Sequence, residues 1–261
     1  MPGPGAPRFE LVGLADLKID EERTMKRVPL YARLKDALID DGYRFRVQRE
    51  GLPIDWHRAL FLNLSFWSAG DNADVVVDER LPADVVAHVA WHHLARRSLG
   101  KSGATVDGML LGESIASAFD AYLIGRLLTD APKSEFVETQ VEAMAEVSGL
   151  AEKQFAKLLE GLALDPVASF GQLRTLLFEL STSLVRATGL EDAAARLAAH
   201  AQHPLFPLVH HYNLSNWILH SRVYGPRIKA RIDPGVAGVH RELAAADSAL
   251  DWLARQWLGS V

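Results

Sequence analysis

The chain has 261 residues, 49% hydrophobic and 23% charged, so it can bury a sizeable core as one large domain or two closely packed ones. A net charge of -5, without basic clusters interleaved with aromatic residues, argues against a nucleic-acid partner. Because the chain has no cysteine, any metal must be held by imidazole, carboxylate or water. No uncharged apolar segment approaches the roughly 20 residues that cross a bilayer, and we expect a cytoplasmic protein without a membrane partner.

The first half of the chain carries mixed helix and strand signals. Helical spacing of apolar residues, alternation of apolar and polar residues, and short apolar runs each mark an element. In chain order we expect a strand between Arg8 and Leu17, a helix from Val28 to Ile39, strands from Tyr43 to Arg49, from Ala59 to Trp67 and from Asp74 to Glu79, and a helix that begins near Leu81.

Helical periodicity replaces strand signals from Met109 onward. The expected helices run from Met109 to Leu128, from Ser134 to Val147, through three or four segments bounded by Gly149, Gly161, Asp165-Pro166, Gly171 and Gly189, and then from Glu191 to Ala201, from Asn213 to Val223 and from Val239 to Leu258.

These signals predict an α+β fold that is mostly helical. A small N-terminal sheet should pack on the helix that begins near Leu81, and a helical C-terminal half should follow. We divide the chain into an N-terminal tail with a possible strand (residues 1–26), an α/β core (27–128) and a helical part packed on that core (129–261). The shared apolar surface favours one unit.

Two histidines lie four residues apart on the helix that begins near Leu81. On a helix, His88 and His92 fall on one face with their Cβ atoms roughly 5–6 Å apart, which is a metal-chelating geometry. Between Asp84 and Arg96 the only polar side chains are histidines, so part of this helix should face the core. A buried imidazole requires a partner, and a metal ion would supply one.

The next helix carries a short polar stripe. Glu113, Ser117 and Asp120 follow one another at spacings of four and three residues, with Met109 before them and Ile124 after them on the same stripe. A solvent-facing stripe normally continues, whereas this one is closed at both ends by apolar residues. We favour a functional site over a solvated stripe, which stays open as the alternative.

Two histidines at this spacing, followed by a glutamate from the next helix, form the ligand set of a zinc site with three protein ligands and an open position. In its order of edge strand, His-x-x-x-His helix and glutamate helix, the chain resembles the gluzincin branch of the zincin metallopeptidases, especially its small compact members, over about residues 27–128. The resemblance implies Zn²⁺ as cofactor and His88, His92 and Glu113 as its ligands. It also implies a peptide or protein ligand along the edge strand from Asp74 to Glu79.

The chain departs from this family at two positions. The family motif is H-E-x-x-H, whose glutamate acts as the general base, and this chain has Val89 there. Loss of general acid/base help typically costs on the order of 10²–10⁴ in rate, so the resemblance implies a degenerate metallopeptidase or an unusual metallohydrolase, weak or inactive as a generic peptidase. Ser117 stands where the family often has an aspartate that braces a ligand imidazole, and we expect Asp120 to take that role.

The remaining histidines are assigned more loosely. His93 lies about 140° around the helix from His88, so it should either hydrogen-bond to the ligand residues from outside the metal site or face the core. A shifted register would instead make it a ligand in place of His92. Four further histidines are expected to be ordinary surface or core residues: His57, His200, His220 and His240.

The rear of the chain has its own cluster of titratable groups, His210, His211 and Tyr212. In zincins a histidine or tyrosine from the C-terminal part commonly stabilises the oxyanion, and the resemblance implies that role for one of these three. The competing interpretation, a loop that leads into a buried helix, is slightly favoured.

Two other classes of function compete with the metal site. In the first, the chain is a non-catalytic helical binding or structural protein, and its His and Glu residues form a buried hydrogen-bond network. The second is a di-metal carboxylate bundle. That class needs a Glu-x-x-His motif on each of two helices, which the sequence lacks, so it ranks last.

Overall fold

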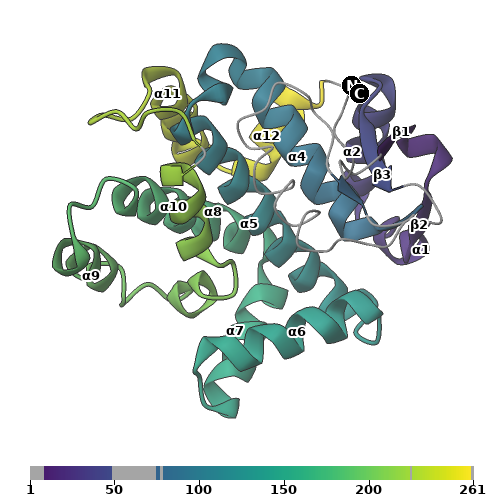
Figure 1. Ribbon diagram of the computed structural model, residues 1–261. Coiled ribbons are helices and arrows are strands. Elements are labelled where there is room, and N and C mark those ends of the chain that lie inside the picture. The colour runs from purple at the N-terminus through teal and green to yellow at the C-terminus, as the bar shows by residue number, and fades with distance from the viewer. Residues whose placement is uncertain (1–8, 49–74, 77–78, 224, 260–261) are drawn as a thin grey trace.

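The computed structural model describes residues 9–48, 75–76, 79–223 and 225–259, and its described part is mostly helical with two small sheets near the N-terminus (Figure 1). This is the α+β class that the sequence predicts. The expected strand from Ala59 to Trp67 lies outside the described residues. No described helix is both long and apolar enough to cross a membrane.

The larger sheet has three strands in the order β1-β3-β4. Strand β1 (Phe9–Gly13) is antiparallel to β3 (Arg44–Gln48), and β3 is parallel to β4 (Val75–Val76). Along β3 the side chains of Phe45 and Val47 are buried, as the alternating pattern predicts. The first strand is shorter than expected, because the chain turns after Gly13 into a 3-10 helix, η1 (Leu14–Asp16).

The second sheet pairs β2 (Lys18–Asp20) with β5 (Arg80–Pro82) in parallel. Helix α1 (Glu22–Met25) and helix α2 (Pro29–Asp40) follow β2, and α2 confirms the helix expected from Val28 to Ile39. Because β5 runs directly into the histidine helix, this small sheet fixes where that helix begins.

Helix α4 (Ala83–Leu99) is the histidine helix. Pro82 is the residue before its first turn, Asp84 lies in that turn, and Arg96 and Arg97 lie in the last turn. Acidic residues at the N-terminus and basic residues at the C-terminus of a helix are favoured by its dipole. Gly100 ends the helix with a φ of 54°, a left-handed conformation that favours glycine.

Helix α5 (Val106–Asp130) runs through the centre of the fold and packs against both α4 and α8 (Pro166–Leu184) (Figure 1). The close approach of α5 to the preceding 3-10 helix, η2 (Gly100–Ala104), depends on glycine, because a Cβ at Gly108 would lie 2.2 Å from the Ser102 backbone oxygen. Most α5 side chains are buried. This central position explains why the helix is apolar on nearly every side and why its few polar groups stand out.

The remaining helices surround α5 and α8. They are α6 (Glu135–Ser148), α7 (Glu152–Leu164), α9 (Leu190–Ala198), η3 (Phe206–Val209), α10 (Leu214–Val223), α11 (Pro234–Ala245) and α12 (Ala249–Trp257), and the short η2 (Gly100–Ala104) joins α4 to α5.

The boundaries in this half differ from the prediction at Gly161, at Gly171 and near Ser248. Gly161 and Gly171 lie inside α7 and α8 rather than between helices. The amphipathic C-terminal segment forms two helices instead of one, since Ser248 begins a new helix by accepting a hydrogen bond from the Asp251 amide at 3.1 Å. Apolar periodicity continued across this break and therefore did not reveal it.

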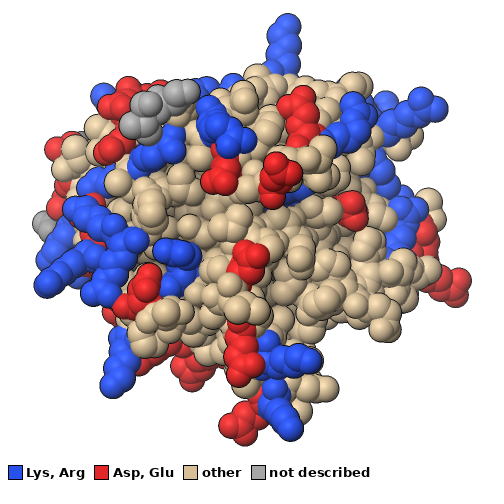
Figure 2. All heavy atoms as spheres, turned by 180° about the vertical axis from the view of Figure 1, so that it is seen from behind, with Lys and Arg blue, Asp and Glu red and all other residues tan. Residues whose placement is uncertain are grey.

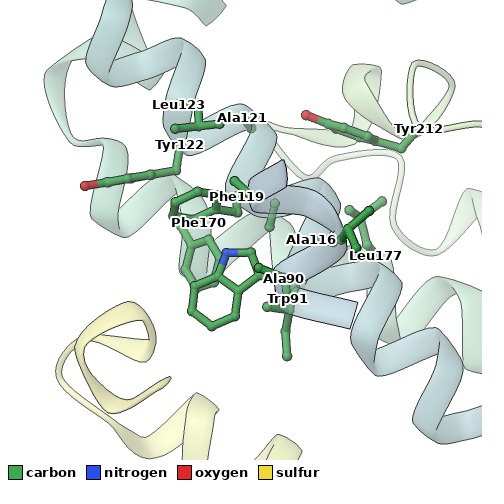
Figure 3. Packing of buried hydrophobic residues seen from close by; sticks show 14 of the residues in the cluster. Ala90, Trp91, Ala116, Phe119, Ala121, Tyr122, Leu123, Phe170, Leu177 and Tyr212 are labelled. Carbon is green, nitrogen blue, oxygen red and sulfur yellow. The ribbon is translucent and has the colours of Figure 1, made fainter. Parts of the chain in front are cut away.

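Aromatic residues from α4, α5 and α8 meet in the core (Figure 3). The rings of Trp91 and Phe119 pack edge to face with centroids 5.5 Å apart, and Phe170 of α8 lies beside them in the same view. A single cluster of buried side chains extends from the N-terminal elements to α12. The histidine helix is therefore anchored on its apolar side by the shared core.

The charged surface is uneven on the face opposite that of Figure 1. Figure 2 shows Lys and Arg gathered on the side of the N-terminal elements, with Asp and Glu among them, and a middle region with few charges. Ion pairs on these elements include Arg80 with Asp20 at 2.5 Å and Lys26 with Glu22 at 3.2 Å. Exposed pairs of this kind contribute roughly 0–1 kcal/mol each to stability, so they do not determine the fold.

Candidate metal centre

Three predicted ligand residues meet between α4 and α5. The Nε2 atoms of His88 and His92 lie 3.2 Å apart. His92 Nε2 is 3.5 Å from Glu113 Oε1, and His88 Nε2 is 3.9 Å from Glu113 Oε2. Each residue thus offers one ligand atom within 4.8 Å of the other two. The four-residue helical spacing of the histidines produces this convergence, since it stacks the two rings on one face of α4.

Asp120 braces His88 from the side opposite the ligand atoms. Its Oδ2 atom lies 2.9 Å from His88 Nδ1. When Nδ1 donates to this carboxylate, Nε2 carries the lone pair on the side of His92 and Glu113, the tautomer usual for metal-binding histidines. Ser117 lies between Glu113 and Asp120 on α5, 3% exposed, and adds no ligand atom to the three-residue cluster.

Gly112, immediately before Glu113, lies beside the second imidazole. A Cβ at Gly112 would lie 3.5 Å from His92 Nδ1 and 3.4 Å from the Ala95 Cβ atom, which is ordinary van der Waals contact. Helices α4 and α5 are therefore in close contact at the carboxylate.

The site is open on its histidine side and nearly closed on its carboxylate side. The side chains of His88 and His92 are 30% and 31% exposed, whereas that of Glu113 is 12% exposed. Burial raises the pKa of Glu113, but the nearby charges of His92 and His88 outweigh burial and hold this pKa below its ordinary value. Glu113 is therefore ionised at neutral pH, as a ligand carboxylate must be.

Asp84 lies one helical turn before His88, in the first turn of α4. Burial, together with the negative charge of Asp120, raises the pKa of Asp84 to about 6. This shift cannot be predicted from sequence spacing, because it depends on how α4 and α5 pack. Asp84 thus adds a second carboxyl group near the Asp120 side of the site.

Val89 occupies the position next to His88 where the zincin motif has its glutamate. Its side chain is 6% exposed and belongs to the apolar core. A valine neither accepts nor donates a proton, so the position contributes packing and no acid/base chemistry.

His93 is directed away from the ligand cluster. Its Nε2 atom lies 2.7 Å from Asp41 Oδ2, and its ring packs edge-on against Tyr43 at 5.2 Å. Arg97 also donates to Asp41. These contacts tie α4 to the turn between α2 and β3, and the cluster of three contains His92 rather than His93.

The rear cluster divides between the site and the surface. His210 is exposed, whereas His211 places its Nε2 atom 3.1 Å from Gln140 Oε1 of α6. Tyr212 is 9% exposed, and the negative charge of Asp120 favours a higher pKa for both His211 and Tyr212. The structure therefore brings His211 and Tyr212 toward the Asp120 side of the site and leaves His210 outside it.

His220 of α10 was expected to be an ordinary core or surface residue. It is 8% exposed, and its charge contributes to the lowered pKa of Glu113, after those of His92 and His88. No spacing in the sequence links it to Glu113, because α10 reaches the site only through tertiary packing.

Comparisons with known proteins give no further guide to the site, because no protein-family model, curated protein or solved structure matches the chain.

Proposed function

We propose that the protein binds one divalent transition-metal ion, zinc by preference, through His88, His92 and Glu113. We further propose that it is a degenerate, zincin-like metallopeptidase or an unusual metallohydrolase, with negligible activity on generic peptides. The observation that carries the proposal is the convergence of two imidazole Nε2 atoms and one carboxylate within 4.8 Å.

The donor set fits zinc. Two neutral imidazoles and one carboxylate are ligands that Zn²⁺ accepts, and three protein ligands leave one position for a substrate or water. When bound, zinc would supply Lewis acidity toward a carbonyl group or a water molecule. The side chains contribute positioning: Asp120 holds His88 in its ligand tautomer, and Glu113 supplies the anionic donor.

Metal analysis of protein purified without a histidine tag tests the proposal. We expect about one equivalent of zinc per chain, and its loss in a Glu113→Ala variant. A metal-free protein whose stability does not change on addition of zinc would contradict the proposal.

The missing base is tested by Val89→Glu. We expect no measurable hydrolysis of generic peptides by the zinc-loaded parent and weak hydrolysis by the variant, because the new carboxylate follows the first ligand directly. Val89 is 6% exposed, so the charged replacement should also lower stability. Val85→Glu, at a partly buried position on the same helix, is the matched control and should stay inactive. Robust peptidase activity in the parent would show that another group serves as the base.

One observation favours a second candidate function. The 3.2 Å contact between His88 Nε2 and His92 Nε2 is also what two imidazoles in a metal-free hydrogen-bond network would make. In that case the cluster would stabilise a non-catalytic binding or structural protein. The metal analysis separates the two candidates, because only the metal site gains stability from zinc.

A peptide or protein ligand along the stretch from Asp74 to Glu79 stays part of the proposal. Within this stretch Val75 and Val76 form β4, which ends the strand order β1-β3-β4 among the described residues. An edge strand can accept an added strand through its main chain. Protection of the Val75 and Val76 amides from hydrogen exchange by a bound peptide would support this part, and unchanged exchange at saturating peptide would contradict it.

A further inference from the structure

Two buried polar atoms on the Asp120 side of the candidate metal centre have no hydrogen-bond partner among the described residues. They are the hydroxyl of Tyr212 and the Oδ1 atom of Asp120. A tyrosine hydroxyl can donate a hydrogen bond, whereas an ionised carboxylate oxygen can only accept one. Buried polar groups are nearly always paired, so complementary unpaired atoms in one region suggest a shared interaction.

The position of Tyr212 suits this pairing. The residue lies in the connection between η3 and α10, and its ring packs edge-on against His211 at 4.9 Å. Figure 3 shows its side chain extending toward the part of α5 that carries Ala121, next to Asp120 in the sequence. Burial and the negative charge of Asp120 together raise the pKa of Tyr212, which places the hydroxyl within the field of that carboxylate.

We propose that Tyr212 is a positioning residue of the metal centre, whose hydroxyl donates a hydrogen bond to Asp120 Oδ1 through one bridging water molecule. Asp120 Oδ2 accepts from His88 Nδ1 at 2.9 Å, so the hydroxyl would act on the metal ligand through the carboxylate. Groups behind a ligand histidine fix its orientation and its basicity. This inference rests on the proposed function, to which it adds a residue from the C-terminal half of the chain.

The inference predicts that Tyr212→Phe weakens zinc binding. Zinc affinity should fall by about tenfold, the lower end of the range for groups that hydrogen-bond to a ligand residue from outside the metal site. The melting temperature of the metal-free protein should also fall slightly, because the variant removes the donor to Asp120 Oδ1. A purely structural tyrosine would lower that temperature and leave zinc affinity unchanged.

The experiment measures zinc affinity by competition with a chromogenic chelator. Tyr122→Phe is the matched control: Tyr122 is 6% exposed, lies on α5 near Asp120 and packs against Phe119 at 5.2 Å. We expect this control to bind zinc as the parent does. Because Tyr212 acts through Asp120, Tyr212→Phe should cause no further loss of affinity when Asp120→Ala is already present.

Each outcome decides the inference. Equal zinc affinity in the parent and in Tyr212→Phe overturns it while leaving the metal site intact. An undiminished loss in the Asp120→Ala background overturns it as well. A parent that binds no zinc overturns the proposed function together with this inference.

Discussion

Between α4 and α5, two imidazoles direct their Nε2 atoms toward the Glu113 carboxylate, whereas between α8 and α11 the imidazole of His240 faces the guanidinium of Arg174. Both clusters lie in or beside the same core and each includes histidine. They differ in the charge of the group that meets the ring, and this difference separates a ligand site from a structural contact.

The Arg174 cluster makes its imidazole a neutral acceptor. Arg174 is fully buried, with Nη1 at 3.1 Å from His240 Nδ1 and Nη2 at 2.7 Å from the Thr175 hydroxyl. Since a guanidinium only donates, Nδ1 must accept, and a protonated ring would face a like charge. Burial and the charge of Arg174 lower the pKa of His240 to about 4. Burial likewise lowers the pKa of Arg174 to about 10.

The candidate metal centre shows the opposite arrangement. Its carboxylates accept from or attract the imidazoles, and Asp120 fixes His88 so that Nε2 faces the space shared with Glu113. Partial exposure of both ligand rings also gives an ion a way in, whereas Arg174 is sealed from solvent. A second imidazole beside the carboxylate and an opening, rather than one histidine with a carboxylate nearby, therefore distinguish the candidate site.

The largest expected effect is on zinc affinity. Removing the carboxylate should lower it at the candidate metal centre, whereas removing the carboxylate at the Arg174 cluster should not. Four-ligand zinc sites have apparent binding energies of about 10–16 kcal/mol, or about 2.5–4 kcal/mol per ligand. Glu113→Ala should therefore lower zinc affinity by about 10²–10³-fold. Glu179→Ala should leave affinity unchanged, although Glu179 Oε1 lies 3.8 Å from His240 Nε2. Isothermal titration of both variants measures the contrast, and equal losses would remove the distinction between the clusters.

Chelation should destabilise the protein through the metal centre alone. At free zinc one hundred times the Kd, binding adds about 2.7 kcal/mol to the free energy of unfolding, and an excess of chelator removes this contribution. Melting curves with and without chelator should therefore differ for the parent and for His240→Asn, but not for His88→Ala. A parent with bound zinc and an unchanged melting curve would contradict the expectation.

The Arg174 cluster should instead respond to acid. The pKa of His240 is about 4 in the folded protein and about 6.5 in the unfolded chain, so the unfolded chain binds more protons between these values. The free energy of unfolding should fall as pH drops from about 6.5 to about 4, by about 2–3 kcal/mol.

The variant His240→Asn isolates this acid response. Its amide oxygen keeps an acceptor for Arg174 but takes up no proton, so its stability should decline less over the same pH range. Denaturant unfolding of chelator-treated parent and variant measures the difference. Parallel pH profiles would show that His240 does not titrate in this range.

The smallest effect concerns His93, which lies next to a ligand in the sequence. Because its Nε2 atom contacts Asp41, His93→Gln should leave zinc affinity unchanged and cost no more than about 1 kcal/mol of stability. Chelator competition and thermal melting provide the two measurements. A large loss of zinc binding would mean that His93, and not His92, is the second ligand.

The sequence predicted those parts of the site that depend on a single helix. The four-residue spacing brought His88 and His92 together, and the stripe on α5 identified Glu113 and Asp120, because helical periodicity is a local property. The mostly helical α+β class followed from the same patterns.

Features that depend on contacts between distant segments were missed. The proximity of His220 to Glu113 and the raised pKa of Asp84 arise only when α4, α5 and α10 pack together. The cap at Ser248, which divides the C-terminal helix, was hidden by apolar periodicity on both sides of it. Tertiary packing, which one sequence does not reveal, decides such features.

The most direct test of the central claim is the position of the metal in crystals of the zinc-loaded protein, located by anomalous scattering at the zinc absorption edge. We expect one peak about 2.0–2.2 Å from His88 Nε2, His92 Nε2 and a Glu113 carboxylate oxygen. A peak bound by other residues, or no peak in crystals grown with excess zinc, would contradict the claim that these three side chains form a metal site.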